Sequence, residues 1–261
     1  NMNGSATIST IPLPVVYTVT GGGSYCTGGS GVAIGLSSSN TGISYQLYRG
    51  VTPVGAALTG TGSALSFGVH ATAGTYTVVA TVIGTFCTSN MSGSAVVSID
   101  PLPVAFSVTG GGSYCTGGTG VSIGLSSSVS GTNYQLYRGA TLVGSPVSGT
   151  GSAISYGLHT TAGTYTVVAT IAATGCVSNM TGSATVSVNA LPTAYTVTGG
   201  GSYCSGGTGV IVGLSGSQGG TTYQLFIGGS PVGSPVSGSG AAINFGLRTA
   251  AGAYSVVATN T

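Results

Sequence analysis

An internal repeat of 89 residues constrains this chain more than any other feature. The run TVTGGGSYCTGG at 18–29 returns with small changes at 107–118 and 196–207, and the register holds along the chain without insertions. Its cysteine therefore recurs every 89 residues, as Cys26, Cys115 and Cys204. Solenoids and propellers repeat every ~20 to 50 residues. A period of 89 suits one small β-sandwich domain per repeat.

The register divides the chain into one short segment and three repeats. Residues 1–11 align with the ends of the first and second repeats, so we interpret them as the last strand of a preceding or neighbouring repeat. A short proline-containing segment stands between successive repeats. Proline has no backbone N–H to donate to a neighbouring strand, so we interpret these segments as junctions between domains. The predicted repeats are 12–100, 101–189 and 190–261, and the third is expected to lack its last strand.

Strands alternate with turns inside each repeat. Valine, isoleucine, leucine and tyrosine recur in alternation between glycine- and serine-rich turns, which is typical of half-buried strands. We therefore predict an all-β fold of tandem immunoglobulin-like sandwiches, with about seven strands per repeat. In the first repeat the expected strands are 15–20, 31–36, 43–49, one or two within 58–67, 75–82 and 94–99.

The cysteines predict one disulfide per repeat. Cys87 follows Cys26 by 61 residues, and Cys176 follows Cys115 by the same 61. We expect the pairs Cys26–Cys87 and Cys115–Cys176, each of which stabilises its domain by ~4 kcal/mol in the chain-entropy model. Cys204 has no equivalent partner in the sequence. Free thiols or catalytic cysteines are the alternative, although the sequence contains no Cys-x-x-Cys motif.

The near absence of charge excludes several functions. Only 2% of the residues are charged, whereas an ordinary globular protein has ~25%. Such a chain has no basic patch for nucleic acid. Its single acid, Asp100, cannot build the oxygen cage that calcium requires, so we expect no metal and no cofactor.

Catalytic groups are not expected either. His70 and His159 occupy equivalent positions, but the third copy is Arg248, and a catalytic or metal-binding role would not tolerate that change. We interpret the three residues as exposed loop positions. The glycine-rich run lacks the Lys-Ser/Thr of a phosphate-binding loop. The chain is therefore not expected to be an enzyme.

Two further features bear on binding. Tyr25, Tyr114 and Tyr203 stand beside the repeating cysteines and could face a carbohydrate ligand, although such rings more often cover a disulfide or fill a core edge. No apolar run approaches the ~18 residues of a membrane helix, so no membrane insertion is expected.

Self-association is the partner interaction that the sequence favours. Edge strands usually carry charges that prevent edge-to-edge pairing, and this chain has almost none. Its surface is then either covered by sugar or packed against copies of itself. The strand-like segment 1–11 leaves two alternatives open: a continuous array of repeats, or strand addition to the third repeat of a neighbouring copy.

The motifs resemble a known class of repeats. The run YTVTGGGSYC at 17–26, YQLY at 45–48, AGTYTVVAT at 73–81, the Cys87 loop and GSAVV at 93–97 are similar to tandem Ig-like repeats of very large bacterial surface proteins. Those proteins include gliding and adhesion proteins exported by the type IX secretion system, and the AGTYTV strand is similar to one in PKD-type domains.

The resemblance implies an extracellular protein at the bacterial cell surface. Together with the composition, it leads us to expect a structural segment of an extracellular filament, stalk or sheath. The alternative is an adhesin whose repeats bind glycans or surfaces directly.

Overall fold

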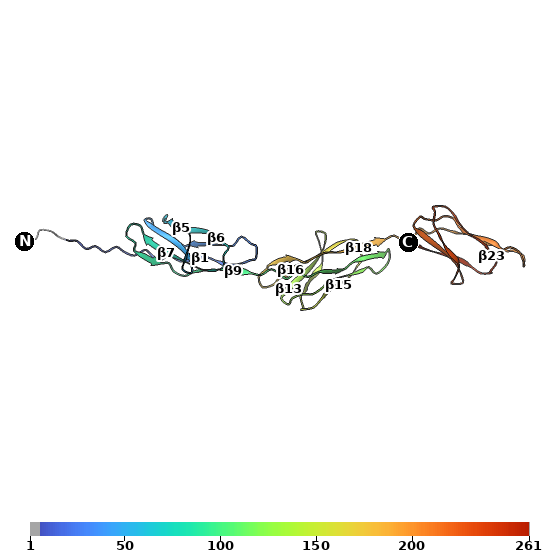
Figure 1. Cartoon of the computed structure of the whole chain (residues 1–261), viewed down its shortest axis with the longest axis horizontal. Coiled ribbons are helices and arrows are strands. Elements are labelled where there is room, and N and C mark those ends of the chain that lie inside the picture. Colours follow the sequence, from blue (N-terminus) through green and yellow to red (C-terminus); the bar gives the residue numbers. More distant parts are fainter. Residues whose placement is uncertain (1–5, 261) are drawn as a thin grey trace, which may run out of the picture. The chain divides into compact units, whose positions relative to one another are not determined.

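The chain folds into β-strands joined by loops. The computed structural model describes residues 6–260, and no helix that could cross a membrane occurs among them (Figure 1). In the first repeat the strands are β1 (Val19–Gly21), β2 (Gly23–Cys26), β3 (Val32–Leu36), β4 (Ile43–Arg49), β5 (Thr52–Thr59), β6 (Leu65–His70), β7 (Gly74–Val82), β8 (Thr88–Asn90) and β9 (Ala95–Asp100).

Strands recur at equivalent positions in the later repeats. The second repeat contains β10 (Val108–Gly110), β11 (Gly112–Cys115), β12 (Val121–Leu125), β13 (Thr132–Arg138), β14 (Thr141–Ser148), β15 (Ile154–His159), β16 (Gly163–Ile171), β17 (Val177–Asn179) and β18 (Ala184–Asn189). The third contains β19 (Val197–Gly199), β20 (Val210–Leu214), β21 (Thr221–Ile227), β22 (Ser230–Ser237), β23 (Ile243–Arg248) and β24 (Tyr254–Asn260).

Each repeat is an Ig-like sandwich of two sheets. In the first repeat one sheet has the order β1-β3-β6, and the other has the order β2-β9-β7-β4-β5 with β8 added to β7. In the third repeat, by contrast, the second sheet is reduced to β22-β21-β24. The sequence-based prediction of tandem all-β sandwiches is confirmed, and the first repeat has nine strands rather than about seven.

The chain divides into two compact units. The first comprises Asn1–Gly110, Ile123–Tyr156 and Thr164–Ala184, and the second comprises the remaining residues. The first repeat lies within the first unit, and residues 185–261, which include the whole third repeat, lie within the second.

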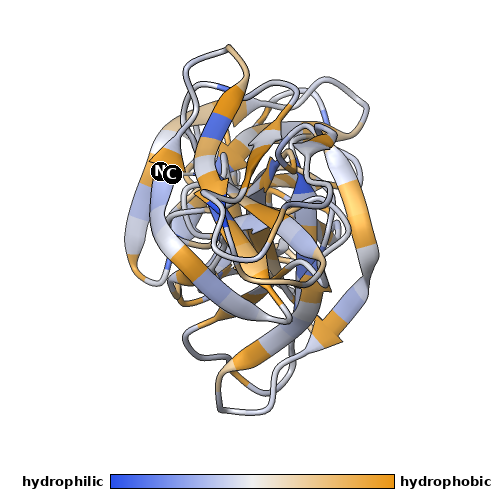
Figure 2. Cartoon of the chain, turned by 90° about the vertical axis from the view of Figure 1, so that its right-hand side faces the viewer, coloured by the Kyte–Doolittle hydropathy of each residue, from blue (hydrophilic) through white to orange (hydrophobic). Residues whose placement is uncertain are grey.

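The core of the first repeat forms between its two sheets. Along β7 the buried residues alternate as Tyr76, Val78 and Ala80, so one face of the strand is sealed from water. They pack with Ile34 and Leu36 from the other sheet in one cluster. Apolar and paler residues alternate along the strands in Figure 2. Successive side chains of a strand point to opposite faces, so the alternation in the sequence places the apolar side chains on one face.

Tyrosines supply much of the buried volume, and their hydroxyls are paired. The Tyr45 ring is fully buried, and its hydroxyl oxygen accepts a hydrogen bond from the backbone N–H of Asn40 at 2.9 Å. The Tyr76 hydroxyl donates to the carbonyl of Thr72 at 2.8 Å. Pairing removes the cost of burying a hydroxyl, so a chain without tryptophan builds its core from tyrosine.

The edge strand β5 is protected without charge. It carries Pro53, and a bulge interrupts its pairing with β4 between Tyr45 and Leu47. The Gln46 side chain fills the bulge, and its Nε2 donates to the carbonyl of Val54 at 3.1 Å. The equivalent edges β14 and β22 also contain proline. Proline and bulges both oppose edge-to-edge pairing, so these edges carry a protection that does not depend on charge.

A half-buried tyrosine of the second repeat is expected to lower the free energy of unfolding at alkaline pH. Burial, and secondarily Tyr134, raises the pKa of Tyr156 from 10.0 to about 12. The phenol therefore stays protonated in the folded state at a pH where the unfolded chain has lost the proton. Its contribution to stability is complete below pH 10 and is lost as the pH rises through about 12.

We predict that Tyr156→Phe flattens the alkaline loss of stability. Phenylalanine occupies the equivalent positions, Phe67 and Phe245, so the substitution fits the fold. The free thiols are alkylated before the measurement. Between pH 9.5 and 11.5, the urea midpoint of the wild-type chain should fall more than that of the variant. This interval spans the lower half of the pKa shift of Tyr156. Equal falls would contradict the assignment.

Candidate functional site

The candidate functional features of this chain lie at the ends of its repeats. The closing strand β9 pairs in parallel with β2, with Cys26 opposite Asp100, and antiparallel with β7, with Gly74 opposite Val97. We call the end at which β9 finishes the distal end. The proximal end is the opposite one, where β7 finishes at Val82 and the Cys87 loop begins.

The distal end is held by the turn that follows β2. The backbone N–H and the hydroxyl of Thr27 both donate to the carbonyl of Asp100, at 2.9 and 3.0 Å. Thr116 makes the same two bonds to Asn189, at 2.9 and 3.1 Å. The distal cysteines, Cys26 and Cys115, are therefore placed directly beside the point where the chain leaves its repeat.

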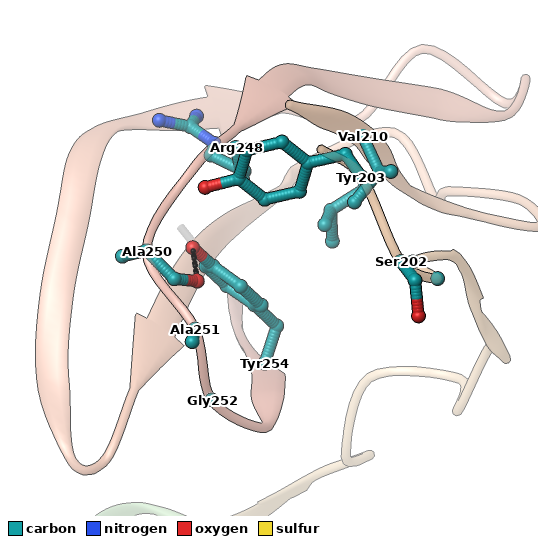
Figure 3. Close-up of a pocket in the computed structure, with 11 residues that line it drawn as sticks. Ser202, Tyr203, Val210, Arg248, Ala250, Ala251, Gly252 and Tyr254 are labelled. Atoms are coloured by element: carbon teal, nitrogen blue, oxygen red, sulfur yellow. Dashed lines mark hydrogen bonds between the residues drawn. The ribbon is translucent and has the colours of Figure 1, made fainter. Parts of the chain in front are cut away.

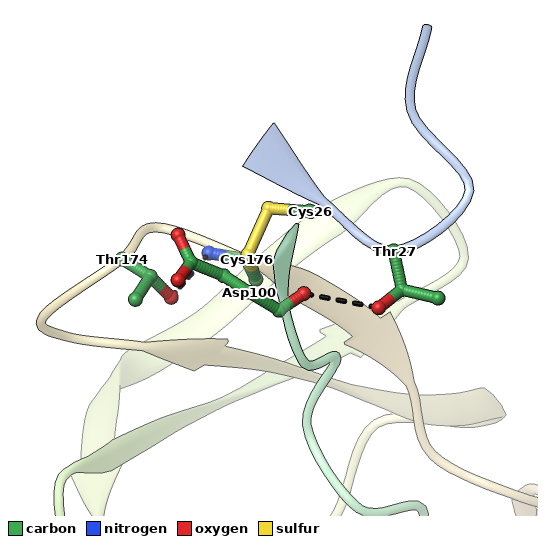
Figure 4. Close-up of a disulfide and its surroundings, with 5 residues drawn as sticks. All are labelled: Cys26, Thr27, Asp100, Thr174 and Cys176. Carbon is green, nitrogen blue, oxygen red and sulfur yellow. Dashed lines mark hydrogen bonds between the residues drawn. A yellow bond between two sulfur atoms is a disulfide. The ribbon is translucent and has the colours of Figure 1, made fainter. Parts of the chain in front are cut away.

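One disulfide joins the first repeat to the second. Cys26 bonds to Cys176, 150 residues further along the chain, with Cα atoms 5.5 Å apart (Figure 4). Cys176 lies in the proximal loop of the second repeat and is fully buried. In the same view Thr27 contacts Asp100 beside the bond. The crosslink therefore spans the junction between two repeats.

This pairing corrects the predicted one disulfide per repeat, Cys26–Cys87 and Cys115–Cys176. Cys26 stands beside the start of β7, whereas Cys87 follows its end, where the Val82 N–H donates to the Cys87 carbonyl at 2.9 Å. A nine-residue strand is ~30 Å long, and a disulfide requires Cα atoms within ~7 Å. Two cysteines at opposite ends of one domain cannot meet.

Three cysteines keep free thiols over the described residues. Cys87 is half-buried, and Cys115 and Cys204 are exposed. Cys87 has the same position in its repeat as the bonded Cys176. Cys115 and Cys204 have the same position in theirs as the bonded Cys26.

The three tyrosines beside the distal cysteines anchor a loop. The hydroxyls of Tyr25, Tyr114 and Tyr203 donate to backbone carbonyls 46 residues further on, those of Ala71, Thr160 and Thr249. Each ring also lies against the glycine four residues later. The bonds give these tyrosines a structural role, and carbohydrate binding by them stays a prediction.

The His/Arg position lies at a strand end and not in an exposed loop. His70 ends β6, is half-buried, and its Nε2 lies 3.1 Å from the Phe67 carbonyl. Arg248 ends β23, and its Nη2 donates to the carbonyl of Phe245. Both side chains cap the carbonyl three residues earlier. Over residues 6–260 no cluster of histidine, cysteine or acidic residues could hold a metal.

The third repeat exposes the surface that β9 covers in the first. Residues 201–204, the counterparts of β2, do not form a strand, and no counterpart of β9 occurs among the described residues. Val19 is 7% exposed, whereas its counterpart Val197 is 38% exposed. A Cβ on Gly22 would meet Val96 backbone atoms at 2.8 and 2.9 Å, whereas one on Gly200 would meet nothing within 4 Å.

An open groove of about 350 Å³ lies in this place. Figure 3 shows Tyr203 and Tyr254 on its walls, with Gly252 at one side and Arg248 above. The Tyr254 hydroxyl donates to the Ala250 carbonyl at 3.0 Å. Five of its lining residues are counterparts of residues that pair with β9 in the first repeat: Gly201, Ser202, Tyr203, Gly252 and Tyr254.

The segment 6–11 carries the sequence of a closing strand but is unpaired. It aligns with β9 and β18, yet none of its residues belongs to a strand, and all six are exposed. Ile8, the counterpart of the buried Val97, is 95% exposed. Residues 1–5, the rest of the predicted strand 1–11, lie outside the described residues.

Comparisons with known proteins agree on the architecture alone. No family model matches the sequence, and no curated protein matches it. Among solved structures, murine CEACAM1b has 13% identity and a TM-score of 0.35, covering 66% of this chain and 100% of that chain. Sidekick-1 immunoglobulin domains 1–5 have 15% identity and a TM-score of 0.35, covering 95% and 55%.

A bacterial structure gives similar values. The fibronectin(III)-like modules of Clostridium thermocellum CbhA have 13% identity and a TM-score of 0.35, covering 66% of this chain and 95% of that chain. The similarity is confined to tandem Ig-like or fibronectin-III-like β-sandwich domains.

We predict that peptide mapping will show the inter-repeat bond. Trypsin cuts this chain only after Arg49, Arg138 and Arg248, since it has no lysine. The Cys26–Cys176 bond joins fragment 1–49 to fragment 139–248. Mass spectrometry of a non-reduced digest of monomeric protein should detect this pair. A bond between fragments 1–49 and 50–138 would instead support Cys26–Cys87 and contradict the structure.

Proposed function

We propose that the chain is a structural segment of an extracellular filament, stalk or sheath, in which copies join end to end by strand addition. Residues 6–11 of one copy enter the open groove of the third repeat of another copy and act as its closing strand. The exposed segment and the open groove in the same chain carry this proposal. The role requires no catalytic group.

The repeat register defines how the donated strand pairs. In the first repeat Val97 faces Gly23 on one side and Gly74 on the other. By the same register, Ile8 of the donor faces Gly201 and Gly252 of the acceptor. Ala6 and Ile8 then point into the core like Ala95 and Val97, which are 1% and 2% exposed. Thr7 points to solvent like Val96.

Both partners gain from this arrangement. Ile8 leaves water, and burial of an isoleucine side chain stabilises by ~1.5–3 kcal/mol. The backbone N–H and C=O groups of the donor pair on both sides, as they do in β9. The acceptor regains cover over Val197 and Tyr254. Burial on one chain and groove closure on the other occur in the same step.

Strand addition is better supported than lateral packing. Every outer edge that contains β5, β14 or β22 carries a proline and a bulge, and both features oppose pairing with a further strand. The groove of the third repeat has neither feature along 201–204. We therefore propose that self-association uses segment 6–11 and the groove of the third repeat rather than the outer edges β5, β14 and β22.

An extracellular location fits the crosslink. Disulfides form and persist in oxidising compartments, and Cys26–Cys176 closes a large loop between repeats. Placement on a bacterial surface, with export by the type IX system, rests on the resemblance of the repeat motifs. The alternative of direct glycan binding would be supported by binding of the single chain to a glycan array.

We predict that Ile8→Asp abolishes association and Thr7→Asp does not. Both substitutions add one negative charge at adjacent positions, but only Ile8 enters the core of the acceptor. Transfer of a carboxylate from water into the apolar core of the acceptor is costly, so the association constant should fall at least ~10-fold. Sedimentation velocity over a range of concentrations measures this, with reductant present to exclude disulfide links.

A second measurement does not depend on whether the Ile8→Asp chain folds. A synthetic peptide of residues 1–16 should occupy the groove and shorten the assemblies, whereas the same peptide with Ile8→Asp should not. Assemblies that tolerate both the Ile8→Asp chain and the competing peptide would overturn the proposal. A chain that stays monomeric at all concentrations would do the same.

A further inference from the structure

The Cys26–Cys176 bond changes the route by which tension passes along this chain. The two cysteines are 150 positions apart in the sequence, and their Cα atoms are 5.5 Å apart. When the chain is pulled from a point before Cys26 and from a point beyond Cys176, the bond is the shortest covalent path between the two points. Residues 27–175 form a closed loop outside this path. They cannot be stretched while the bond is intact.

This closed loop contains most of two domains. It includes β3 to β9 of the first repeat and β10 to β16 of the second. The core strands β4 and β7 of the first repeat therefore lie inside it. Outside the loop, β1 and β2 precede Cys176's partner and β17 and β18 follow Cys176. A pulling force thus acts directly on four short strands of these two repeats and not on their cores.

Cys26 is anchored in the first repeat at the point where β9 ends. β2, which ends at Cys26, pairs in parallel with β9, and Thr27 makes two hydrogen bonds to the carbonyl of Asp100 beside the disulfide (Figure 4). The Tyr25 hydroxyl holds β2 to the Ala71 carbonyl. As long as the second repeat stays folded, the disulfide limits how far Asp100 can be pulled away from Cys26. The closing strand β9 is therefore protected from being drawn out of the sandwich.

Cys176 is anchored in the second repeat at the end of a core strand. The Ile171 N–H, at the end of β16, donates to the Cys176 carbonyl at 2.9 Å, and the Gly175 N–H donates to the Ile171 carbonyl at 2.8 Å. The Cys176 side chain is fully buried. A thiolate must reach a sulfur to break a disulfide, so the folded proximal loop shields this sulfur from small thiols.

We propose that the Cys26–Cys176 disulfide is a mechanical crosslink, which carries tension past residues 27–175 and keeps the first two repeats from unfolding when the chain is pulled. Both anchors and the short path between them carry this inference. It goes beyond the proposed function, because it concerns a single chain and does not require strand addition. A segment that serves as a stalk or filament would then extend little under force.

Single-molecule pulling of the full chain through added terminal tags tests the inference, with the free thiols alkylated beforehand. A stretched residue contributes ~3.6 Å, so the fully stretched wild-type chain should be ~540 Å shorter than the Cys26→Ser chain. Cys176→Ser should give the same length as Cys26→Ser. The large unfolding steps of the first two repeats should occur in both variants and be missing from the wild type.

Two controls accompany this measurement. The third repeat lies outside the closed loop, so its unfolding step should appear in every chain. Cys87→Ser removes a cysteine that takes no part in the crosslink, and its stretched length should equal that of the wild type. A Cys26–Cys87 bond would instead shorten the chain by only 61 positions, ~220 Å, and Cys87→Ser would remove that shortening.

The stretched length is read after every repeat has unfolded, so it does not depend on whether a serine variant folds. Equal lengths of the wild-type and Cys26→Ser chains would overturn the inference. Large unfolding steps of the first two repeats in the wild-type chain would overturn it as well. Either result would leave strand addition standing, because that proposal concerns segment 6–11 and the groove of the third repeat and is tested by sedimentation.

Discussion

The structure depends most on the pairing of the closing strand, which is β9 in the first repeat. In the first repeat β9 lies between β2 and β7, seals the core with Ala95 and Val97, and ends beside Cys26. One strand thus completes the sandwich, sets the distal end and positions the cysteine that bonds to the next repeat. Where that strand is absent from the described residues, as in the third repeat, the counterparts of β2 do not form a strand.

A chain with almost no charge needs other ways to stabilise its cores and to prevent pairing between outer edges. Its cores are built on tyrosines whose hydroxyls are paired with the backbone, and its outer edges are protected by proline and by glutamine-filled bulges. Neither device depends on ionic strength or on neutral pH. The groove of the third repeat carries neither device along 201–204, and the proposed contacts between copies form there.

Much of this architecture could be predicted from the sequence, and the missing part has a physical cause. The repeat and the β-branched strands such as β4 and β7 follow from local alternation. The strand β2 was missed because Gly-Ser-Tyr-Cys has no strand pattern of its own, and parallel pairing with the distant β9 makes it a strand. Parallel pairing of segments over 70 residues apart leaves no local signal.

The cysteine pairing was missed for a different reason. In a repeat of 89 residues, the separations of 61 and 150 differ by one period, so spacing alone cannot distinguish a bond within a repeat from one between repeats. The direction of β7, which places Cys26 and Cys87 at opposite ends, decides between them. For the third repeat the alignment predicted only that the last strand is missing, and the open groove follows from the structure, in which Val197 and Gly200 are uncovered.

Hydrogen–deuterium exchange at two protein concentrations tests the central claim most directly. If residues 6–11 close the third repeat of another copy, amides of 6–11 and of 201–204 should both gain protection on assembly, while those of β2 stay protected throughout. Protection that appears in only one of the two segments, or assembly that protects neither, would contradict the account.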